Sequence, residues 1–401
     1  MTPIGIGIEA FSNALRGGVS GIGPLTLCDP TPYECRVAAE VRDFDPTRFL
    51  DLREAKALPR VAQFAVAASR LALESAKLDK VPDPTRTGIV FGTSSGPIDY
   101  LFEQQSLFIE RGARRMHPST PMFAHNGVIA SEAAIQLGVR GNVFTVSSAC
   151  TSGADVIGLG RMMIAGGGSD VMLLGAADAP ITPPLFAAFD RLGMMPRAYN
   201  DDPGAACRPF DVAREGMVLG EGAVVFVVER ELHARRRGVE ILAEIAGYGA
   251  TCDASSHFRQ EASGEDASRA VRIALDMAAI SSKDLDYVSA HGTGTRENDP
   301  FETRVLRRVL ERECGRVLVG ASKSQFGHTL GASGALEAAA VIAGMRDGYA
   351  PANISLQAVD PECDLAHVAR DVRVCEMRAA LSTNFGFGSR NAALVFRKIE
   401  N

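Results

Sequence analysis

Two segments of the chain, about 170 residues apart, carry the same order of local patterns, and this similarity constrains the fold most strongly. Residues 142–167 have the pattern of a short apolar strand, a turn with Ser and Cys, and a helix rich in Gly and Ala. Residues 316–345 have the pattern of a strand, a turn with Ser, Lys and His, and a similar helix. A repeat of this kind indicates a duplicated core. We therefore predict two related halves, residues 1–238 and 239–401, which meet near the polar stretch Arg235–Gly238 and pack as one body.

Short buried strands alternate with helical patterns along both halves, which predicts an α/β body with largely buried sheets. A chain of 401 residues, 46% of them hydrophobic, also buries enough surface to fold without disulfides or a structural metal. Strands are predicted at Gly88–Gly92, Asn142–Val146, Val171–Leu174, Ala223–Val228, Ile241–Ile245, Tyr287–Ala290 and Val317–Val319, and helices at Val61–Leu78, 152–165, Glu265–Ala279, Phe301–Glu313 and 333–346.

Charge and composition exclude several classes of protein. The net charge is −6, no block of like charges is present and Trp is absent, which argues against a nucleic-acid-binding surface. The eight cysteines form no C-x-x-C pair, so they are expected to be reduced thiols. The first residues do not have the pattern of a secretion signal, and the longest apolar runs are too short to span a bilayer. These features predict a cytoplasmic protein.

Cys150 lies in the turn SSACTSG, between a predicted strand and a predicted helix. A thiol at the start of a helix is close to the positive end of the helix dipole and to free backbone N–H groups, which favour the thiolate. The small neighbours from Ser147 to Gly153 leave room for a substrate. Because cysteine is also often buried and inert, a packing role is the alternative. The other seven cysteines are not in such a turn and are predicted to be packing residues.

Two histidines and a lysine lie in comparable turns. His291, in SAHGTGT, follows a predicted strand, and His328, in KSQFGHTLGASG, comes five residues after Lys323. The carboxyl ends of strands are where α/β proteins form their sites, although a loop histidine bound to the backbone is the alternative. Together with Cys150, these residues predict nucleophilic catalysis. Their spacings match no metal-binding pattern, so no metal is expected.

Two acidic residues are further candidates. Asp299 ends the motif HGTGTREND and is either a helix cap or part of the site. Glu337 is a lone acid in the apolar helix GALEAAAVIAG. If it is buried it needs a partner, for which Lys323 or His328 is the natural candidate, and an exposed helix glutamate is the alternative.

The motifs SSACTSG, RPFDVAREGMVLGEGA, HGTGTREND, KSQFGHTLGASGALEA and NFGFGSRNA resemble those of the β-ketoacyl-(acyl carrier protein) synthases, most closely the elongating type. These are the decarboxylating condensing enzymes of fatty-acid and polyketide synthesis. The resemblance extends over nearly the whole chain. It implies a thiolase-like fold, in which two similar halves form a five-layer αβαβα sandwich, and a homodimer.

The resemblance also assigns roles to individual residues. It implies that Cys150 accepts the acyl group and that His291 and His328 are the paired catalytic histidines. The backbone N–H of Phe387, on a mobile loop, is expected to complete an oxyanion hole with that of Cys150. The remaining polar residues that match the family's supporting positions are Lys323, Asp299 and Glu337.

The implied reaction is a decarboxylative Claisen condensation. Cys150 is acylated, malonyl carrier protein loses carbon dioxide, and the resulting carbanion attacks the acyl-cysteine to give a 3-ketoacyl product. No step is a redox reaction, so no cofactor is expected. Two other interpretations are a non-catalytic chain-length partner of a heterodimeric synthase, against which the presence of Cys150 argues, and a thiolase-fold acyltransferase without decarboxylation. A biosynthetic thiolase would carry a second cysteine at the turn that here holds His328.

The implied partner is an acyl carrier protein, in its acyl and malonyl forms. Because such carriers are acidic, a local basic patch would favour docking. Lys56, Arg114 and Arg115 are the candidates, and a solvated surface is the alternative for the two arginines.

Two features depart from the family pattern. The family usually opens with a strand before TPIG, whereas this sequence begins at Met1-Thr2-Pro3, so either one edge strand is missing or the start is placed late. The usual GFGGTN is here GFGSRN, with Arg390 in place of a small hydroxyl residue. An arginine at this position must pair with an acid, point to solvent or face the substrate channel. The last arrangement would favour a polar or anionic acyl substrate.

Overall fold

The computed structural model describes residues 1–399, which form two mixed β-sheets with related strand orders. The order of the first sheet is β4-β3-β5-β6, and that of the second is β7-β13-β12-β8-β9. The first sheet consists of β3 (Thr87–Gly92), β4 (Val143–Val146), β5 (Val171–Asp178) and β6 (Gly222–Glu229). The second consists of β7 (Glu244–Cys252), β8 (Tyr287–Ser289), β9 (Leu318–Gly320), β12 (Ala379–Gly386) and β13 (Arg390–Arg397).

The two sheets repeat one pattern of pairing, which accounts for the internal similarity of the sequence. β5 pairs antiparallel with β6 and parallel with β3, and β3 pairs parallel with β4. In the second sheet, β12 pairs antiparallel with β13 and parallel with β8, and β8 pairs parallel with β9. The sheets are therefore duplicates, with β7 as an additional strand that pairs antiparallel with β13. Their strands come from opposite sides of residue 238, and the exact division of the halves there stays a prediction.

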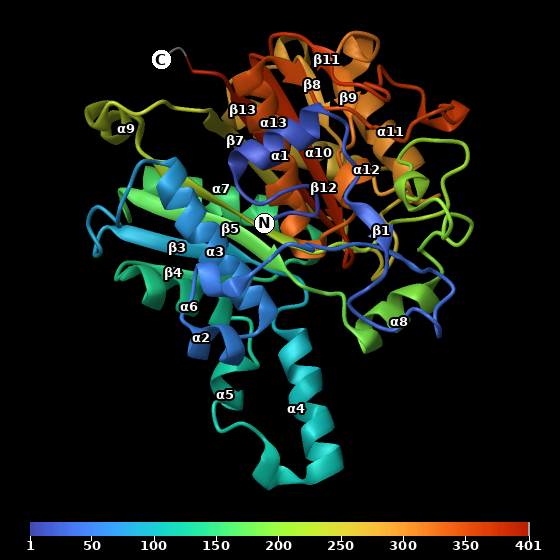
Figure 1. The fold of residues 1–401 in the computed structure, drawn as a ribbon. Helices are drawn as coiled ribbons and strands as arrows, with labels where there is room; N and C mark the ends of the chain where they lie inside the picture. Colours follow the sequence, from blue (N-terminus) through green and yellow to red (C-terminus); the bar gives the residue numbers. More distant parts are fainter. Residues whose placement is uncertain (400–401) are drawn as a thin grey trace.

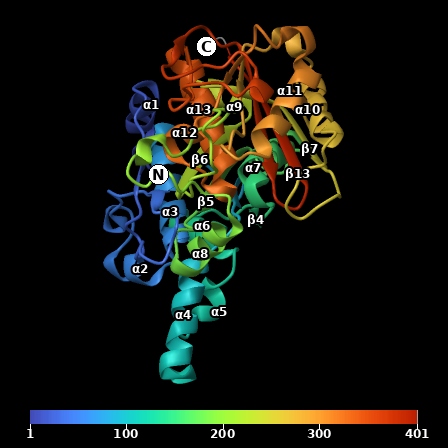
Figure 2. The ribbon, with the colours of Figure 1, turned by 90° about the vertical axis from the view of Figure 1, so that its right-hand side faces the viewer.

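Helices separate and cover the two sheets, so the body has five layers in the order αβαβα (Figures 1 and 2). α3 and α6 cover the outer face of the first sheet, α7 and α13 lie between the sheets and contact both, and α10 covers the outer face of the second with α11 beside it. These helices are α3 (Arg60–Ser75), α6 (Val128–Leu137), α7 (Ser152–Ala165), α10 (Glu265–Met277), α11 (Asn298–Leu310) and α13 (Ser333–Asp347).

Small residues let the central helices approach both sheets closely. A Cβ atom at Gly158 of α7 would lie 2.1 Å from the ring of Tyr248 on β7, and one at Gly160 would lie 2.1 Å from the side chain of Leu174 on β5. The alanines of α13 have the same effect, and most of them are fully buried. The Gly- and Ala-rich patterns of the two repeats thus mark the helices of the middle layer.

The remaining elements lie around this body. α4 and α5 project away from it (Figure 1). The structure describes no helix that is both long and apolar enough to cross a membrane. The remaining helices of at least four residues are α1 (Ile8–Arg16), α2 (Leu52–Ala57), α4 (Ile98–Arg111), α5 (Thr120–Phe123), α8 (Pro183–Leu192), α9 (Glu231–Arg237) and α12 (Lys323–Phe326), and the short strands are β1 (Ile22–Pro24), β2 (Val37–Ala39), β10 (Tyr349–Ala350) and β11 (Arg373–Val374).

The predicted helices correspond to α3, α7, α10, α11 and α13, with ends that differ by at most three residues. One predicted strand is misplaced. Residues 241–243 precede β7, which begins at Glu244 and follows β13 as far as Cys252. Ile241–Ile245 is the more apolar run, but the backbone pairing is made by the glycine- and alanine-containing stretch after it.

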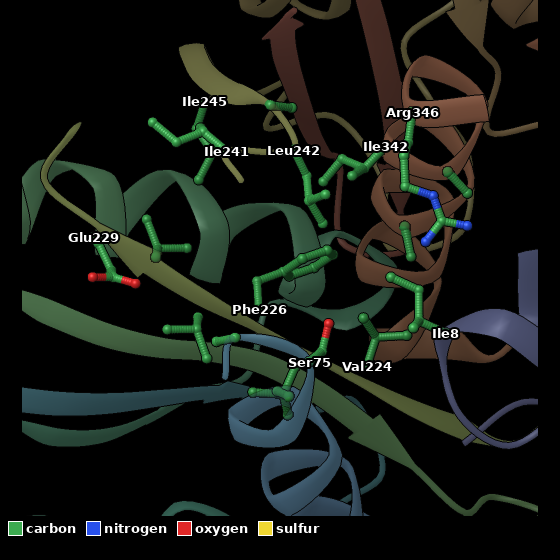
Figure 3. Close-up of a pocket in the computed structure, with 18 of the residues that line it drawn as sticks. Ile8, Ser75, Val224, Phe226, Glu229, Ile241, Leu242, Ile245, Ile342 and Arg346 are labelled. Atoms are coloured by element: carbon green, nitrogen blue, oxygen red, sulfur yellow. The ribbon is translucent and has the colours of Figure 1, made fainter. Parts of the chain in front are cut away.

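The first sheet has no counterpart of β7 among residues 1–399. Met1 pairs with the outer edge of β6: its amino group donates to Ala223 O at 2.9 Å, and the Ala223 N–H donates to Met1 O at 2.8 Å. Beyond this pair, a groove of about 760 Å³ follows β6 (Figure 3). Its walls are largely apolar and include Phe226 on β6, Ile342 on α13, and Leu242, which precedes β7.

Candidate active site

Cys150 lies in a sharp turn between β4 and α7. Ala149 has a φ of 55°, a left-handed conformation that is uncommon for a residue other than glycine. The turn is held by Ser152, whose Oγ accepts from the Ser148 N–H at 2.8 Å and donates to Ala149 O at 2.7 Å. Cys150 therefore lies just before the first turn of α7, as predicted, and only 6% of its surface is exposed.

The ionisation of Cys150 differs from the prediction. Burial raises the pKa of its thiol to about 11, although the Lys323 ammonium and the Phe387 N–H act in the opposite direction. The start of a helix favours a thiolate, but in this enclosed position the loss of solvent is the larger effect. In the structure as described, the thiol is protonated at neutral pH.

The end of β12 lies against the Cys150 turn. A Cβ atom at Gly386 would lie 3.3 Å from Cys150 N and 3.5 Å from Thr151 N, so a side chain there would be in tight contact with the turn. The next residue, Phe387, directs its backbone N–H at the Cys150 sulfur. The backbone N–H groups of Cys150 and Phe387 are thus both close to the thiol, and they are the two donors expected for an oxyanion hole.

His291 and His328 meet beside the thiol. His291 follows β8, and His328 lies between α12 and α13. Their ring centroids are 5.3 Å apart and the rings are nearly perpendicular. Both residues line one cavity with Cys150. The structure therefore brings together the three residues that the sequence analysis selects from separate turns.

Lys323 fixes the proton of His291. Its Nζ lies 3.1 Å from His291 Nδ1 and donates to His291 O at 2.6 Å. An ammonium is only a donor, so Nδ1 of His291 must be the acceptor and the proton of the neutral ring is on Nε2. The position of His328 is set by Ser333, whose Oγ lies 2.7 Å from His328 Nδ1.

Lys323 and Glu337 form a fully buried ion pair beneath the histidines, as expected for a buried Glu337. Asn384 on β12 donates to the other carboxylate oxygen of Glu337. Burial raises the pKa of Glu337 to about 7, and Lys323 acts in the opposite direction. Because Lys323 is paired with Glu337, its positive charge can be held in a fully buried part of the protein.

Both histidines are neutral. Burial lowers the pKa of His291 well below its usual value, and the positive charge of Lys323 lowers it further. Burial and then Lys323 do the same to the pKa of His328. The site therefore offers imidazole N–H donors and not imidazolium ions.

The cavity at these residues is small, and aromatic side chains form part of its lining. Its volume is about 50 Å³, which holds a few water molecules but no acyl chain. Phe387 and Phe258 both line it, with ring centroids 6.1 Å apart. The larger groove of Figure 3 shares no lining residue with this cavity in the described part of the chain.

Asp299 is buried near the cavity but does not line it. Its carboxylate accepts from the Phe210 N–H at 2.7 Å and the Gly294 N–H at 3.2 Å. Burial raises its pKa to about 6. It therefore connects the turn after His291 to the RPFD segment. Its side chain does not cap α11, and it makes no direct contact with the catalytic residues.

Arg390 contacts the backbone near Cys150. Its Nη1 donates to Ser147 O at 3.3 Å, and it is not among the residues that line the cavity. No ion pair with an acid involves Arg390 within residues 1–399. The expected salt bridge is therefore not formed among these residues, and a position of Arg390 facing the substrate channel stays a prediction.

The expected docking residues are exposed, and they line neither cavity. Lys56 is on α2, and Arg114 and Arg115 follow α4 in the projecting part of the chain. Their role in docking stays a prediction.

Two buried acids that support the site were not identified from the sequence. Glu302 on α11 accepts from the backbone N–H groups of His291 and Gly292 at 2.7 and 2.8 Å. Asp178, at the end of β5, accepts from Ser94 N at 2.8 Å and from Gly331 N at 2.7 Å. A signal for Glu302 is its position three residues after Asp299, on the same face of the helix. A signal for Asp178 is an acid at the end of an apolar strand.

Fold and site together define a thiolase-fold acyltransferase, and comparison with known proteins agrees. The family model "Beta-ketoacyl synthase, N-terminal domain" matches residues 1–234, and "Beta-ketoacyl synthase, C-terminal domain" matches residues 242–357. The chain belongs to the β-ketoacyl synthase family.

Similar proteins come from both branches of this family. A 3-oxoacyl-[acyl-carrier-protein] synthase 2 of Synechocystis is 37% identical over 100% of this chain and 96% of its own length. The actinorhodin polyketide putative beta-ketoacyl synthase 1 of Streptomyces coelicolor is 38% identical over 99% of this chain and 86% of its own. A solved ketosynthase, in complex with its type II polyketide acyl carrier protein, has a TM-score of 0.90 and 26% identity, with 99% of this chain and 97% of that chain covered.

Proposed function

We propose that this chain condenses a cysteine-bound acyl group with malonyl carrier protein, and that Cys150, His291 and His328 carry out the reaction. The observation that supports this most directly is the pair of buried, neutral imidazoles beside a helix-start thiol. Neutral N–H donors stabilise an enolate oxygen without protonating the carbanion that must react.

The first half-reaction transfers the acyl group. Cys150 Sγ attacks the carbonyl carbon of an acyl thioester, and the backbone N–H groups of Cys150 and Phe387 stabilise the oxyanion. The bond to the carrier's thiol then breaks, and that thiol leaves with the proton that Cys150 has given up. The product is an S-acyl enzyme.

The second half-reaction forms the carbon–carbon bond. Malonyl carrier protein loses carbon dioxide, and its thioester oxygen accepts hydrogen bonds from His291 and His328 as the enolate forms. The carbanion attacks the acyl carbonyl on Cys150, the C–S bond breaks and the cysteine sulfur takes up a proton. The 3-ketoacyl carrier protein is longer by two carbons, and no oxidant or reductant is needed.

Entry of the acyl chain requires movement of the loop that carries Phe387. The cavity is too small for an acyl chain, and Phe387 and Phe258 are among the residues that line it. We propose that this loop opens for each substrate and closes to place its N–H beside Cys150. Closure also excludes water from the acyl enzyme.

The proposed partners are an acyl carrier protein and a second copy of this chain. The edge strand β4 has no further partner within residues 1–399, and its Phe144 is 53% exposed. Ile135 of α6 and Met162 of α7 are exposed nearby, at 72% and 51%. An unpaired apolar edge of this kind suits a two-fold dimer in which β4 pairs with its copy. Lys56, Arg114 and Arg115 remain the proposed docking residues for the carrier, and the unpaired cysteines suit a reducing cytoplasm.

The test is intact-mass analysis of the purified protein after incubation with a series of acyl carrier proteins. The parent should gain one acyl group and, with malonyl carrier protein, release a 3-ketoacyl product. Cys150→Ala should gain none, whereas Cys207→Ala, which changes another buried cysteine, should behave as the parent does. An acyl adduct on Cys150→Ala contradicts the assignment. Acylation without carbon dioxide release in the parent favours an acyltransferase that does not decarboxylate.

A further inference from the structure

Asp155, in the first turn of α7, is a buried carboxylate that the proposed reaction does not use. Three hydroxyl groups surround it. Thr151 Oγ1 and Tyr248 OH each lie 2.8 Å from one of its oxygens, and Ser148 Oγ contacts it as well. No Lys or Arg forms an ion pair with it in the part of the chain that the structure describes. A carboxylate only accepts hydrogen bonds, so Ser148 and Tyr248 donate to Asp155, and Thr151 shares its one proton between Asp155 and Ser148 O, which is also 2.8 Å away.

Two of these hydroxyls belong to the Cys150 turn. Ser148 precedes the strained Ala149, and Thr151 directly follows Cys150. Asp155 therefore holds the turn on both sides of the nucleophile. The orientation of the Ala149–Cys150 peptide sets the direction of the Cys150 N–H, one of the two proposed oxyanion donors.

The third hydroxyl comes from the other half of the molecule. Tyr248 is on β7 in the second sheet, and its ring lies against Gly158 of α7, where a Cβ atom would come within 2.1 Å. Burial and the neighbouring Asp155 carboxylate raise the pKa of Tyr248, so its hydroxyl stays protonated and continues to donate. Tyr248 thus fixes Asp155 from the side opposite the Cys150 turn.

We propose that Asp155, held by Tyr248, is a positioning residue that aims the backbone N–H of Cys150 at the developing oxyanion. The inference rests on the proposed function, because it assigns no separate reaction. It predicts a specific defect. Loss of Asp155 should slow reactions that pass through an oxyanion more than reactions of the same sulfur that do not.

The experiment compares two reagents on the full-length protein. Acylation of Cys150 by p-nitrophenyl acetate needs the oxyanion hole, and alkylation by iodoacetamide does not. Asp155→Ala should slow acylation about 100-fold, the size of a lost or misplaced oxyanion donor, and change alkylation by less than about threefold. Tyr248→Phe keeps the ring and should slow acylation about tenfold, because Asp155 remains but is less well held.

Controls separate positioning from general loss of stability. Tyr349→Phe removes the hydroxyl of another buried tyrosine, which reaches Ser12 O at 3.5 Å, and it should change neither rate. The double variant Asp155→Ala/Tyr248→Phe should be no slower than Asp155→Ala alone, since Tyr248 acts through Asp155.

Equal losses of acylation and alkylation in Asp155→Ala or Tyr248→Phe, or no loss of acylation in either, would overturn the proposal. If Asp155→Ala does not fold, Tyr248→Phe and Asp155→Asn give the same comparison. Both reagents act without carrier protein, so the outcome is distinguishable from failure of the condensation itself, which shows as a parent enzyme that makes no 3-ketoacyl product.

Discussion

At the scale of single residues, the contact between Lys323 and His291 determines which ring nitrogen of His291 carries the proton. Lys323 occupies its Nδ1 side, so the ring must present Nε2–H to the cavity. Glu337 and Asn384 hold Lys323 there. A histidine at this turn without Lys323 would be free to change tautomer, and the site would lose one of its two donors.

This arrangement predicts that the two half-reactions separate on mutation. His291→Ala and His328→Ala should still be acylated on Cys150, because that step depends on the sulfur and the backbone N–H groups. Each should lose malonyl decarboxylation by about 100-fold or more, as expected when a transition-state donor worth about 3 kcal/mol is removed. Release of labelled carbon dioxide from malonyl carrier protein measures this directly. A variant that releases it at the parent rate contradicts the role of that histidine.

The raised pKa of the Cys150 thiol, about 11, predicts how its reactivity depends on pH. The reactive form is the thiolate, so alkylation by iodoacetamide should rise about tenfold per pH unit and still be rising above pH 9.5. Free cysteine, whose pKa is about 8.5, levels off earlier and serves as the control. A plateau for Cys150 near pH 7 would show that the helix dipole outweighs burial in solution.

At the scale of elements, the loop after β12 controls access to the thiol. Phe387→Ala removes the ring that covers the cavity and should admit water to Cys150. Alkylation at pH 8 should then be faster by about tenfold, the effect of a one-unit fall in the thiol pKa. Phe258→Ala removes a ring at the same cavity without moving the backbone beside Cys150, so its effect should be smaller. Equal rates for Phe387→Ala and the parent would mean that the loop is already open in solution.

At the scale of the whole molecule, much of the architecture follows from the sequence. The two repeats mark α7 and α13 because a helix between two sheets must be lined with small residues on several sides. The turns that hold Cys150, His291 and His328 can also be identified from the sequence, because each contains a reactive side chain shortly after a predicted strand. The comparisons confirm the fold and the family.

What the sequence does not reveal is set by contacts between distant segments. β12 and β13 are absent from the predicted elements because strands buried in the middle of a sheet need no alternating pattern; β12 even contains buried Ser, Thr and Asn. The role of Asp155 depends on Tyr248, 93 positions away. The raised pKa of Cys150 depends on its burial in the folded protein, which no local pattern encodes.

The assembly of two copies is the prediction that belongs to the whole molecule. If β4 pairs with its copy, Phe144 lies in the interface, and a charge there is a known way to block pairing at a sheet edge. Phe144→Lys should convert the dimer to a monomer, as measured by light scattering during size-exclusion chromatography. Val374→Lys places the same charge on an exposed apolar residue of β11 and should leave the dimer unchanged. A Phe144→Lys protein that keeps the parent's mass would rule out the β4 edge as the interface, because a lysine from each copy would then have to be buried there.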